Sequence, residues 1–136
     1  MKLLFICKHN RFRSKVGEAI FNTINKNKNI AAESAGILID EVHLYVAKSV
    51  VKIMKEEGYS IGGIPRRVDI KKINNYELLV IVADNVDPLF FKDSFKGKII
   101  WWKVHDCDER DLDGIRERIG DIKKRVRKLV EEMKNE

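Results

Sequence analysis

Short apolar runs alternate with stretches of helical periodicity along this chain, and no other feature restricts its fold as strongly. The runs at residues 2–6, 30–33, 78–83 and 98–104 are short and dominated by apolar residues, as expected of strands buried on both faces. Chains in which strands and helices alternate form parallel sheets covered by helices. The sequence therefore predicts an α/β fold, a three-layer α/β/α sandwich around a small parallel sheet of about four strands.

Amphipathic stretches lie between and after these runs. We expect the first helix to follow Ser14, which can cap it, and to end within the polar residues 22–29. We expect the second helix to begin at Val42 and to end at Gly58. A short helical turn is expected near residues 87–91. The third helix precedes the C-terminus. The apolar stripes of the three helices comprise Val16, Ala19, Ile20 and Ile24, then Val42, Tyr45, Val46, Val50, Ile53 and Met54, and finally Ile115, Ile119, Ile122, Val126, Leu129, Val130 and Met133.

Length and composition fit one globular unit. The 136 residues are 44% hydrophobic and 35% charged, and a chain of this size can bury a core without a disulfide framework. We therefore expect a single domain over residues 1–136. The first apolar run is too short for a secretory signal, and no later stretch approaches a membrane span. We expect a cytoplasmic protein in which Cys7 and Cys107 are free thiols.

The charge balance favours anionic partners without selecting one. The net charge is +6 and the isoelectric point is near 9.3. We interpret the basic residues at 123–128 as a solvated helix face rather than a nucleic-acid or membrane surface. Glutamine is absent while Lys, Glu and Ile are abundant, which suggests a thermophilic source as a hypothesis. No zinc-type cysteine spacing or glycine-rich nucleotide motif occurs, so we predict no metal and no cofactor, and the oligomeric state stays open.

The loop at residues 7–14, CKHNRFRS, lies where a parallel sheet binds its ligands, beyond the end of a strand. A loop between a strand and a helix N-terminus directs backbone N–H groups and the positive end of the helix dipole at a common centre, which favours an anion. Cys7 and Arg13 enclose five residues, so a loop curled around the anion places the thiol beneath it and the guanidinium beside it. The same field favours the thiolate form of a cysteine, and an arginine can bind two phosphate oxygens at once. Ser14 can donate a hydrogen bond to the sulfur when it leaves.

The pattern Cys-x5-Arg-Ser between a buried strand and a helix is the signature of cysteine-dependent phosphatases. Near the N-terminus and continued by VGEAIF, it closely resembles the low-molecular-weight protein tyrosine phosphatases and their relatives, the thioredoxin-coupled arsenate reductases. The resemblance extends along most of the chain. It includes ESAG at residues 33–36, VADN at residues 82–85 and WKVHD at residues 102–106.

The resemblance implies a low-molecular-weight protein tyrosine phosphatase that acts on phosphotyrosine proteins or small aryl phosphates, with phosphate, vanadate and arsenate as inhibitory anions. It implies that Cys7 attacks phosphorus and that Arg13 clamps the equatorial oxygens. It further implies that Asp106 protonates the leaving phenolate and then activates water. The remaining residues of the phosphate-binding loop are then Lys8, His9, Asn10, Arg11, Phe12 and Ser14, and Ser34 braces the loop from the ESAG segment.

The sequence departs from the family pattern at three positions. Cys107 stands where the family usually has a proline after its acid, so the choice of Asp106 over Asp108 rests on the alignment to Trp102. Phe12 occupies the place of a second loop cysteine, which excludes a disulfide within the loop. His9 replaces the usual glycine, as in some relatives that resemble arsenate reductases.

Two alternative functions stay open beside hydrolysis. Arsenate reduction on this scaffold requires two further cysteines after the third strand, and residues 82–89 contain none. Cys107 is the remaining candidate for a resolving thiol, and we interpret it as a bystander. The second alternative is a phosphate- or phosphoprotein-binding module that keeps the loop without a working acid. The phosphatase interpretation leads.

We expect the residues around the loop to shape its entrance or to have structural roles, rather than to take part in the chemistry. We expect the side chains of Lys8, Arg11 and Phe12 to face outward and to shape the entrance with an aromatic wall and a positive rim. Arg66 and Arg67 are interpreted as part of a solvated loop, with a place at the mouth as the alternative. The histidines are interpreted as structural or solvent-facing because no carboxylate or second histidine stands at metal-ligand spacing. They are His9, His43 and His105.

Overall fold

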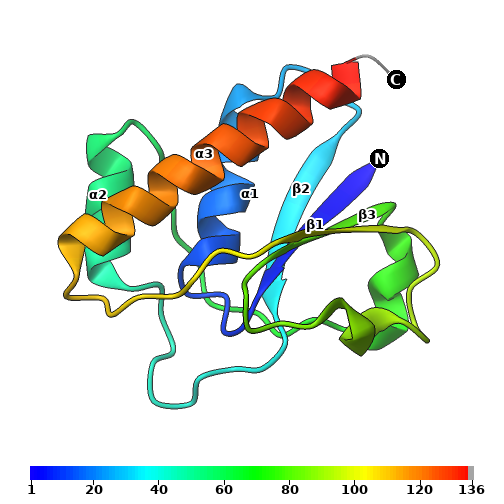
Figure 1. Cartoon of the computed structure of the whole chain (residues 1–136), viewed down its shortest axis with the longest axis horizontal. Coiled ribbons are helices and arrows are strands. Elements are labelled where there is room, and N and C mark those ends of the chain that lie inside the picture. The colour runs from blue at the N-terminus through cyan, green and yellow to red at the C-terminus, as the bar shows by residue number, and fades with distance from the viewer. Residues whose placement is uncertain (135–136) are drawn as a thin grey trace.

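The computed structural model describes residues 1–134 and contains the predicted four-stranded parallel sheet (Figure 1). The strands are β1 (Lys2–Cys7), β2 (Ala31–Gly36), β3 (Leu78–Val82) and β4 (Lys98–Trp102). Their spatial order is β2-β1-β3-β4, and every pair is parallel. Because all carboxyl ends meet at one edge, the loops that follow β1, β3 and β4 converge there. The predicted α/β class and parallel sheet are confirmed.

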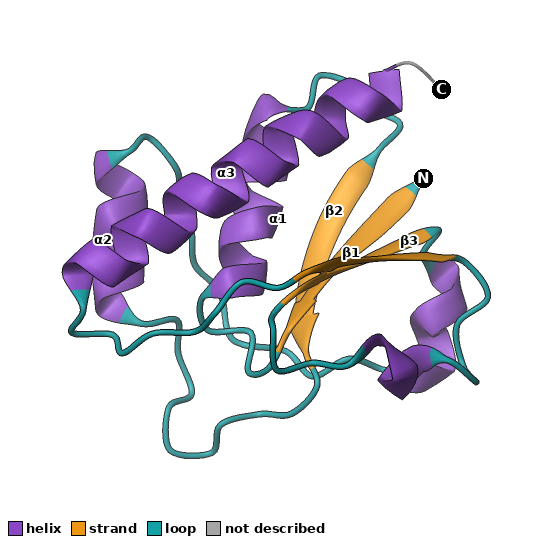
Figure 2. Cartoon of the chain, viewed as in Figure 1, coloured by secondary structure: helices purple, strands orange, loops and turns teal. Residues whose placement is uncertain are grey.

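The two faces of the sheet are covered by different kinds of helix (Figure 2). Three α-helices lie on one face, namely α1 (Arg13–Ile24), α2 (Lys48–Glu56) and α3 (Leu112–Lys134). Two short 3-10 helices, η1 (Ile70–Asn75) and η2 (Pro88–Phe91), lie on the other face. Each face has its own cluster of buried apolar side chains. The turn at η2 was predicted from the sequence, but η1 was not, because its polar sequence IKKINN has little apolar periodicity.

Close packing places α1 directly on β1. A Cβ atom added to Gly17 would lie 2.8 Å from the ring of Phe5, so only glycine allows this approach. Phe5 also packs at 6.1 Å between ring centroids against Trp102 of β4. The start of α1 is therefore fixed relative to the end of β1, and the loop between them has little freedom.

The second helix is shorter than predicted. It begins at Lys48, whereas the apolar spacing placed its start near Val42. Val42 is 83% exposed and Tyr45 is 71% exposed, so neither belongs to a buried helical stripe. Val46 and Val50 are buried as expected, and the helix ends ahead of Gly58, which has a φ of 93°. Apolar residues at 42–46 are spaced as in a helix, but these residues form a loop.

The other helices follow their predicted stripes with small changes at the ends. Helix α1 begins at Arg13 with Phe12 at its N-cap, so Ser14 lies in the first turn and caps nothing. The stripe of α3 from Ile115 to Val130 is buried. Within residues 1–134, none of the helices combines the length and the apolar composition that crossing a bilayer requires.

Candidate active site

The end of β1 and the start of α1 form the predicted loop at residues 7–14. Cys7 is the last residue of β1 and is 2% exposed, and its Sγ lies 2.9 Å from the Oγ of Ser14. Ser14 is held in turn by Asn10, whose side-chain amide donates to the Ser14 Oγ at 2.7 Å. The thiol and the hydroxyl therefore face each other inside the loop.

Asn10 organises the interior of the loop. It is fully buried and adopts a φ of 58°, the left-handed conformation that asparagine tolerates better than most residues. Besides Ser14, its amide donates to the Oγ of Ser34 at 3.0 Å, and its Oδ1 accepts the backbone N–H of Arg66 at 2.9 Å. Ser34 donates its hydroxyl proton to Glu18. Asn10 thus connects the loop to β2 and to the segment that precedes η1.

Gly36, the last residue of β2, supports the loop from behind. A Cβ atom at this position would lie 2.8 Å from the carbonyl carbon of His9 and 2.9 Å from the backbone nitrogen of Asn10. Backbone atoms cannot move aside as the end of a flexible side chain can. The backbone N–H of Ile37 also donates to the carbonyls of Cys7 and Lys8. The glycine of the ESAG segment is therefore required by direct contact with the loop.

Arg13 places its guanidinium between the loop and the ends of β3 and β4. It is 2% exposed, and one of its nitrogens donates to the carbonyl of Val104 at 3.0 Å. The same nitrogen lies 3.5 Å from a carboxylate oxygen of Asp84, and the other terminal nitrogen lies 3.8 Å from a carboxylate oxygen of Asp106. These contacts fix the orientation of a buried cation beside Cys7.

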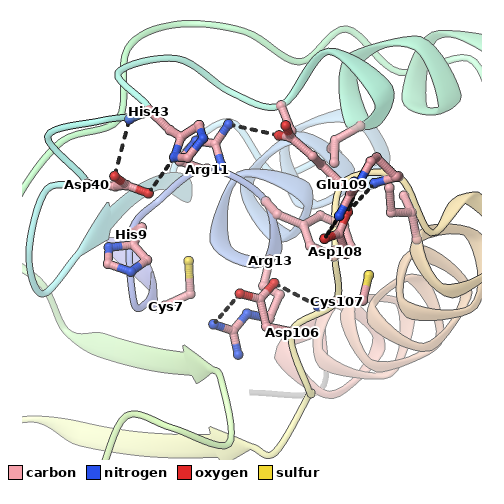
Figure 3. Close-up of a pocket in the computed structure, with 15 residues that line it drawn as sticks. Cys7, His9, Arg11, Arg13, Asp40, His43, Asp106, Cys107, Asp108 and Glu109 are labelled. Carbon is pink, nitrogen blue, oxygen red and sulfur yellow. Dashed lines mark hydrogen bonds and ion pairs between the residues drawn. The ribbon is translucent and has the colours of Figure 1, made fainter.

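A pocket of about 400 Å³ opens over the loop (Figure 3). Of the predicted site residues, six line it: Cys7, His9, Arg11, Phe12, Arg13 and Asp106. The other predicted residues do not line it. Asn10, Ser14 and Ser34 are buried behind the loop, and Lys8 is partly exposed. The remaining lining residues are Asp40, His43, Ala47, Val50, Ile115 and residues 107–110.

The entrance differs from the expectation at one position and matches it at another. Phe12 is only 7% exposed because its ring belongs to the core cluster beneath the α-helices, so it does not face outward. Arg11 does reach the rim, where it donates to the carbonyl of Tyr45 at 2.8 Å and to Glu109 at 3.1 Å. The rim is thus bridged by ion pairs rather than uniformly positive.

The two acids considered for proton transfer have different surroundings. Asp106 is half exposed beside Arg13, and Arg118 of α3 holds the carbonyls of His105 and Asp106 at 3.1 and 3.4 Å. Asp108 accepts hydrogen bonds from the side chain and backbone of Arg110, which lower the pKa of this carboxyl to about 2. Asp108 is therefore ionised across the range in which most enzymes work. Of these two acids, Asp106 is the one in contact with Arg13, whose other carboxylate contact is Asp84.

Cys107 lines the same pocket but stands apart from Cys7. Figure 3 shows the two sulfur atoms on opposite sides of the Asp106 carboxylate. Burial raises the pKa of the Cys107 thiol, with the neighbouring carboxylates of Asp106 and Asp111 acting in the same direction. Cys107 is therefore mostly a neutral thiol near pH 7.

Two of the three histidines, His43 and His105, pair with carboxylates. The Nδ1 of His43 lies 3.0 Å from Asp40, and His105 pairs with Asp84, the carboxylate that also contacts Arg13. His9 has a buried Nδ1 without a hydrogen-bond partner among residues 1–134. Asp84 lies in the predicted VADN segment, but its contact with Arg13 spans 71 positions and follows only from the sheet order. Over the described residues, no cluster of three or more His, Cys, Asp or Glu side chains is arranged to hold a metal ion.

A buried cysteine and arginine in a loop between the first strand and first helix of a parallel sheet define a class of enzymes with a phosphate-binding loop. The family model of the low molecular weight phosphotyrosine protein phosphatases matches residues 2–136. The chain belongs to this family, which confirms the resemblance seen in the sequence.

Similar proteins within the family include both phosphatases and arsenate reductases. A glutaredoxin arsenate reductase from Synechocystis is 26% identical over 95% of each chain. The crystal structure of an arsenate reductase from Archaeoglobus fulgidus matches with a TM-score of 0.78 at 29% identity, covering 94% of this chain and 98% of that one. A low molecular weight protein tyrosine phosphatase from T. tengcongensis matches with a TM-score of 0.81 at 22% identity, covering 97% and 99%. The last match shows the fold alone.

Proposed function

We propose that the protein is a phosphatase that hydrolyses phosphotyrosine or small aryl phosphates through a cysteinyl-phosphate intermediate. The observation that carries this proposal is the single pocket lined by the thiol of Cys7, the guanidinium of Arg13 and the carboxylate of Asp106. Those three groups are what a phosphoryl transfer to sulfur needs: a nucleophile, a fixed cation for the phosphate oxygens and a proton donor for the leaving group.

The proposed reaction has two steps. In the first, the Cys7 thiolate forms a bond to phosphorus while the bond to the aryl oxygen breaks, and Asp106 transfers its proton to that oxygen. In the second, Asp106 takes a proton from water as the water oxygen attacks phosphorus and the phosphorus–sulfur bond breaks. Arg13 binds the equatorial oxygens throughout, and the hydroxyl of Ser14, 2.9 Å from the sulfur, stabilises the thiolate as it leaves.

The loop geometry supports these roles. The contacts of Arg13 with Val104 and Asp84 leave its guanidinium oriented before substrate arrives, so little ordering is needed at the moment of reaction. We propose Asp106 rather than Asp108 as the acid. The carboxylate of Asp108 accepts hydrogen bonds from the Arg110 side chain and has a pKa of about 2.

The test is stopped-flow hydrolysis of p-nitrophenyl phosphate between pH 4 and pH 8. We expect a burst of nitrophenol followed by steady turnover, inhibition by vanadate, and no turnover in Cys7→Ser, which keeps the anion cradle. The Cys107→Ser variant is the matched control and should turn over normally. Ordinary activity in Cys7→Ser would refute the mechanism, and phosphopeptide binding without any burst would favour a non-catalytic binding module.

Arsenate reduction is the second candidate, and one observation favours it: the curated Synechocystis relative and the Archaeoglobus structure both bear that name. Reduction of arsenate to arsenite takes two electrons, which a thiol pair or an external thiol must supply. Residues 82–89 contain no cysteine, and Cys107 lies across the Asp106 carboxylate from Cys7 (Figure 3). Arsenite production with glutaredoxin and glutathione or with thioredoxin, lost in Cys107→Ser, would place this function first.

A further inference from the structure

A second pocket lies on the opposite face of the sheet from the α-helices. Its volume is about 410 Å³, close to the 400 Å³ of the catalytic pocket, and the two share no lining residue. Its floor is made of Leu4, Ala35 and Val68, which are buried members of the apolar cluster on this face. Leu4 comes from β1 and Ala35 from β2, and the three floor residues are between 2% and 8% exposed.

Positive charge surrounds this apolar floor. Four basic residues line the pocket against two acidic ones: Lys2, Arg66, Arg67 and Lys72 against Glu33 and Asp69. Arg66 and Arg67, assigned to a solvated loop from the sequence, therefore contribute to a pocket, though not to the catalytic mouth.

The two carboxylates are already engaged. Glu33 lies 3.5 Å from the ammonium of Lys2 and 3.6 Å from the guanidinium of Arg66, and it accepts a hydrogen bond from the hydroxyl of Tyr76. Burial and this hydrogen bond raise the pKa of Tyr76 to about 12, so its hydroxyl keeps the proton that it donates. Asp69 caps η1 by accepting the backbone N–H of Lys71 at 3.0 Å. Both carboxylates keep their negative charge, but neither lies within ion-pair distance of the two remaining cations of the pocket.

Arg67 and Lys72 are those remaining cations. Within residues 1–134, neither side chain has a carboxylate within ion-pair distance or a hydrogen-bond acceptor. Both line the same pocket, where like charges repel and an anion between them is attracted to each. An arginine beside a lysine also suits an oxyanion, since the guanidinium can bind two of its oxygens and the ammonium a third.

We propose that this pocket is a second anion site, which binds the phosphate or phosphonate group of a small molecule between Arg67 and Lys72 and places an attached apolar group on Leu4, Ala35 and Val68. Arg66 lines this pocket and also connects it to the catalytic loop. The backbone N–H of Arg66 donates to Asn10 at 2.9 Å, its carbonyl accepts from Gly36 at 2.7 Å, and its guanidinium donates to the Ser34 carbonyl.

The test is an NMR titration of the full-length protein with inorganic phosphate and, separately, with phenylphosphonate. The amides of Lys8 to Ser14 report on the catalytic loop, and those of Val68, Asp69 and Asn75 report on the second pocket. We expect two sets of shifts with separate isotherms, and tighter binding of phenylphosphonate at the second pocket. Because the two sets of amide shifts are resolved, absence of binding at the loop around Cys7 can be distinguished from absence of binding at the second pocket.

The variant Arg67→Ala/Lys72→Ala should weaken binding at the second set at least about tenfold, since two charge-assisted contacts are lost. The matched control is Lys71→Ala/Lys96→Ala, which removes the same charge from exposed residues outside the pocket and should retain the affinity. Lys72→Glu alone, on the exposed side of η1, gives a second variant with the charge reversed. Absence of the second set in the unmodified protein, or equal losses in both double variants, would overturn the proposal. Equal affinities for the two probes would contradict the role of the apolar floor.

Discussion

The loop at residues 7–14 and the segment at residues 105–111 meet across one pocket, yet they are held in opposite ways. In the loop, Cys7, Asn10, Arg13 and Ser14 are at most 2% exposed, and Asn10 and Arg13 each bind groups from other elements. In the segment that follows β4, the side chains of Asp106 and Asp108 are 53% exposed. The proposed anion cradle is thus buried in the core, whereas the proposed acid lies on an exposed segment that accepts hydrogen bonds from Arg11, Ser49 and Arg118.

This difference has a physical reason. A cradle of backbone N–H groups binds an anion well only when those groups are already oriented, so burial and a dense hydrogen-bond network are useful there. A proton donor must reach leaving groups of different size, and in the second step its carboxylate must accept a proton from a water molecule that enters the pocket. Exposure suits that task. Substitutions in the two regions should therefore differ in the size of their effect and in the property that they change.

The largest effect is expected from Gly36→Ala, which tests the rigid region. The new Cβ would lie within 3 Å of backbone atoms of Lys8, His9 and Asn10, and such overpacking costs about 1–3 kcal/mol. We expect a lower melting temperature and loss of vanadate inhibition. Gly62→Ala is the matched control, because a Cβ there meets nothing within 4 Å, and it should leave both unchanged. Normal vanadate inhibition in Gly36→Ala would show that the cradle tolerates displacement.

The next effect is expected from Asp106→Asn, which tests the exposed region. Without a proton donor, hydrolysis of phenyl phosphate should slow roughly a hundredfold or more, while dinitrophenyl phosphate, whose leaving group needs no proton, should be affected far less. Asp108→Asn should leave both rates unchanged, because Asp108 is ionised above a pH of about 2 and has no proton to give. If Asp108→Asn produced the dependence on the leaving group, the assignment of the acid would be reversed.

A smaller effect is expected from Arg118→Gln, which tests how the exposed segment is positioned. Arg118 holds the carbonyls of His105 and Asp106, so its loss should lower kcat for phenyl phosphate on the order of tenfold with little change in KM. Arg116→Gln, on the same helix, breaks only an exposed pair with Glu56 and should change neither constant. Equal rates in both variants would mean that the segment positions itself without α3.

The smallest effect concerns Cys107. Because burial raises the pKa of its thiol, less thiolate is present at a given pH, and alkylation should be slower than for an ordinary exposed cysteine. In a Cys7→Ser background, the rate of reaction with iodoacetamide should rise with a midpoint above that of a free cysteine. A midpoint at or below the free value would identify Cys107 as an activated thiol and would strengthen the reductase alternative.

Contacts between near neighbours were predictable from the sequence, and contacts between distant segments were not. The pairing of Cys7 with Ser14 follows from a spacing of seven residues in a strand–loop–helix unit. The fixing of Arg13 by Val104 depends on β4 lying two strands away from β1. The spacing of Val42 and Tyr45 favoured a helix that their exposure rules out, because an apolar stripe forms a helix only where it can be buried.

The sequence by itself determined the parallel α/β class, the position of the loop at residues 7–14 and the presence of a thiol and a guanidinium near its two ends. These features depend on local periodicity and short spacings, which one segment of chain contains completely. Only the tertiary structure decided that Asp84 and Asp106 both lie beside Arg13, that Phe12 is buried, and that Arg66 and Arg67 line a second pocket. Each of those outcomes depends on the order of the strands and on how far each face of the sheet is covered, and no local pattern encodes either.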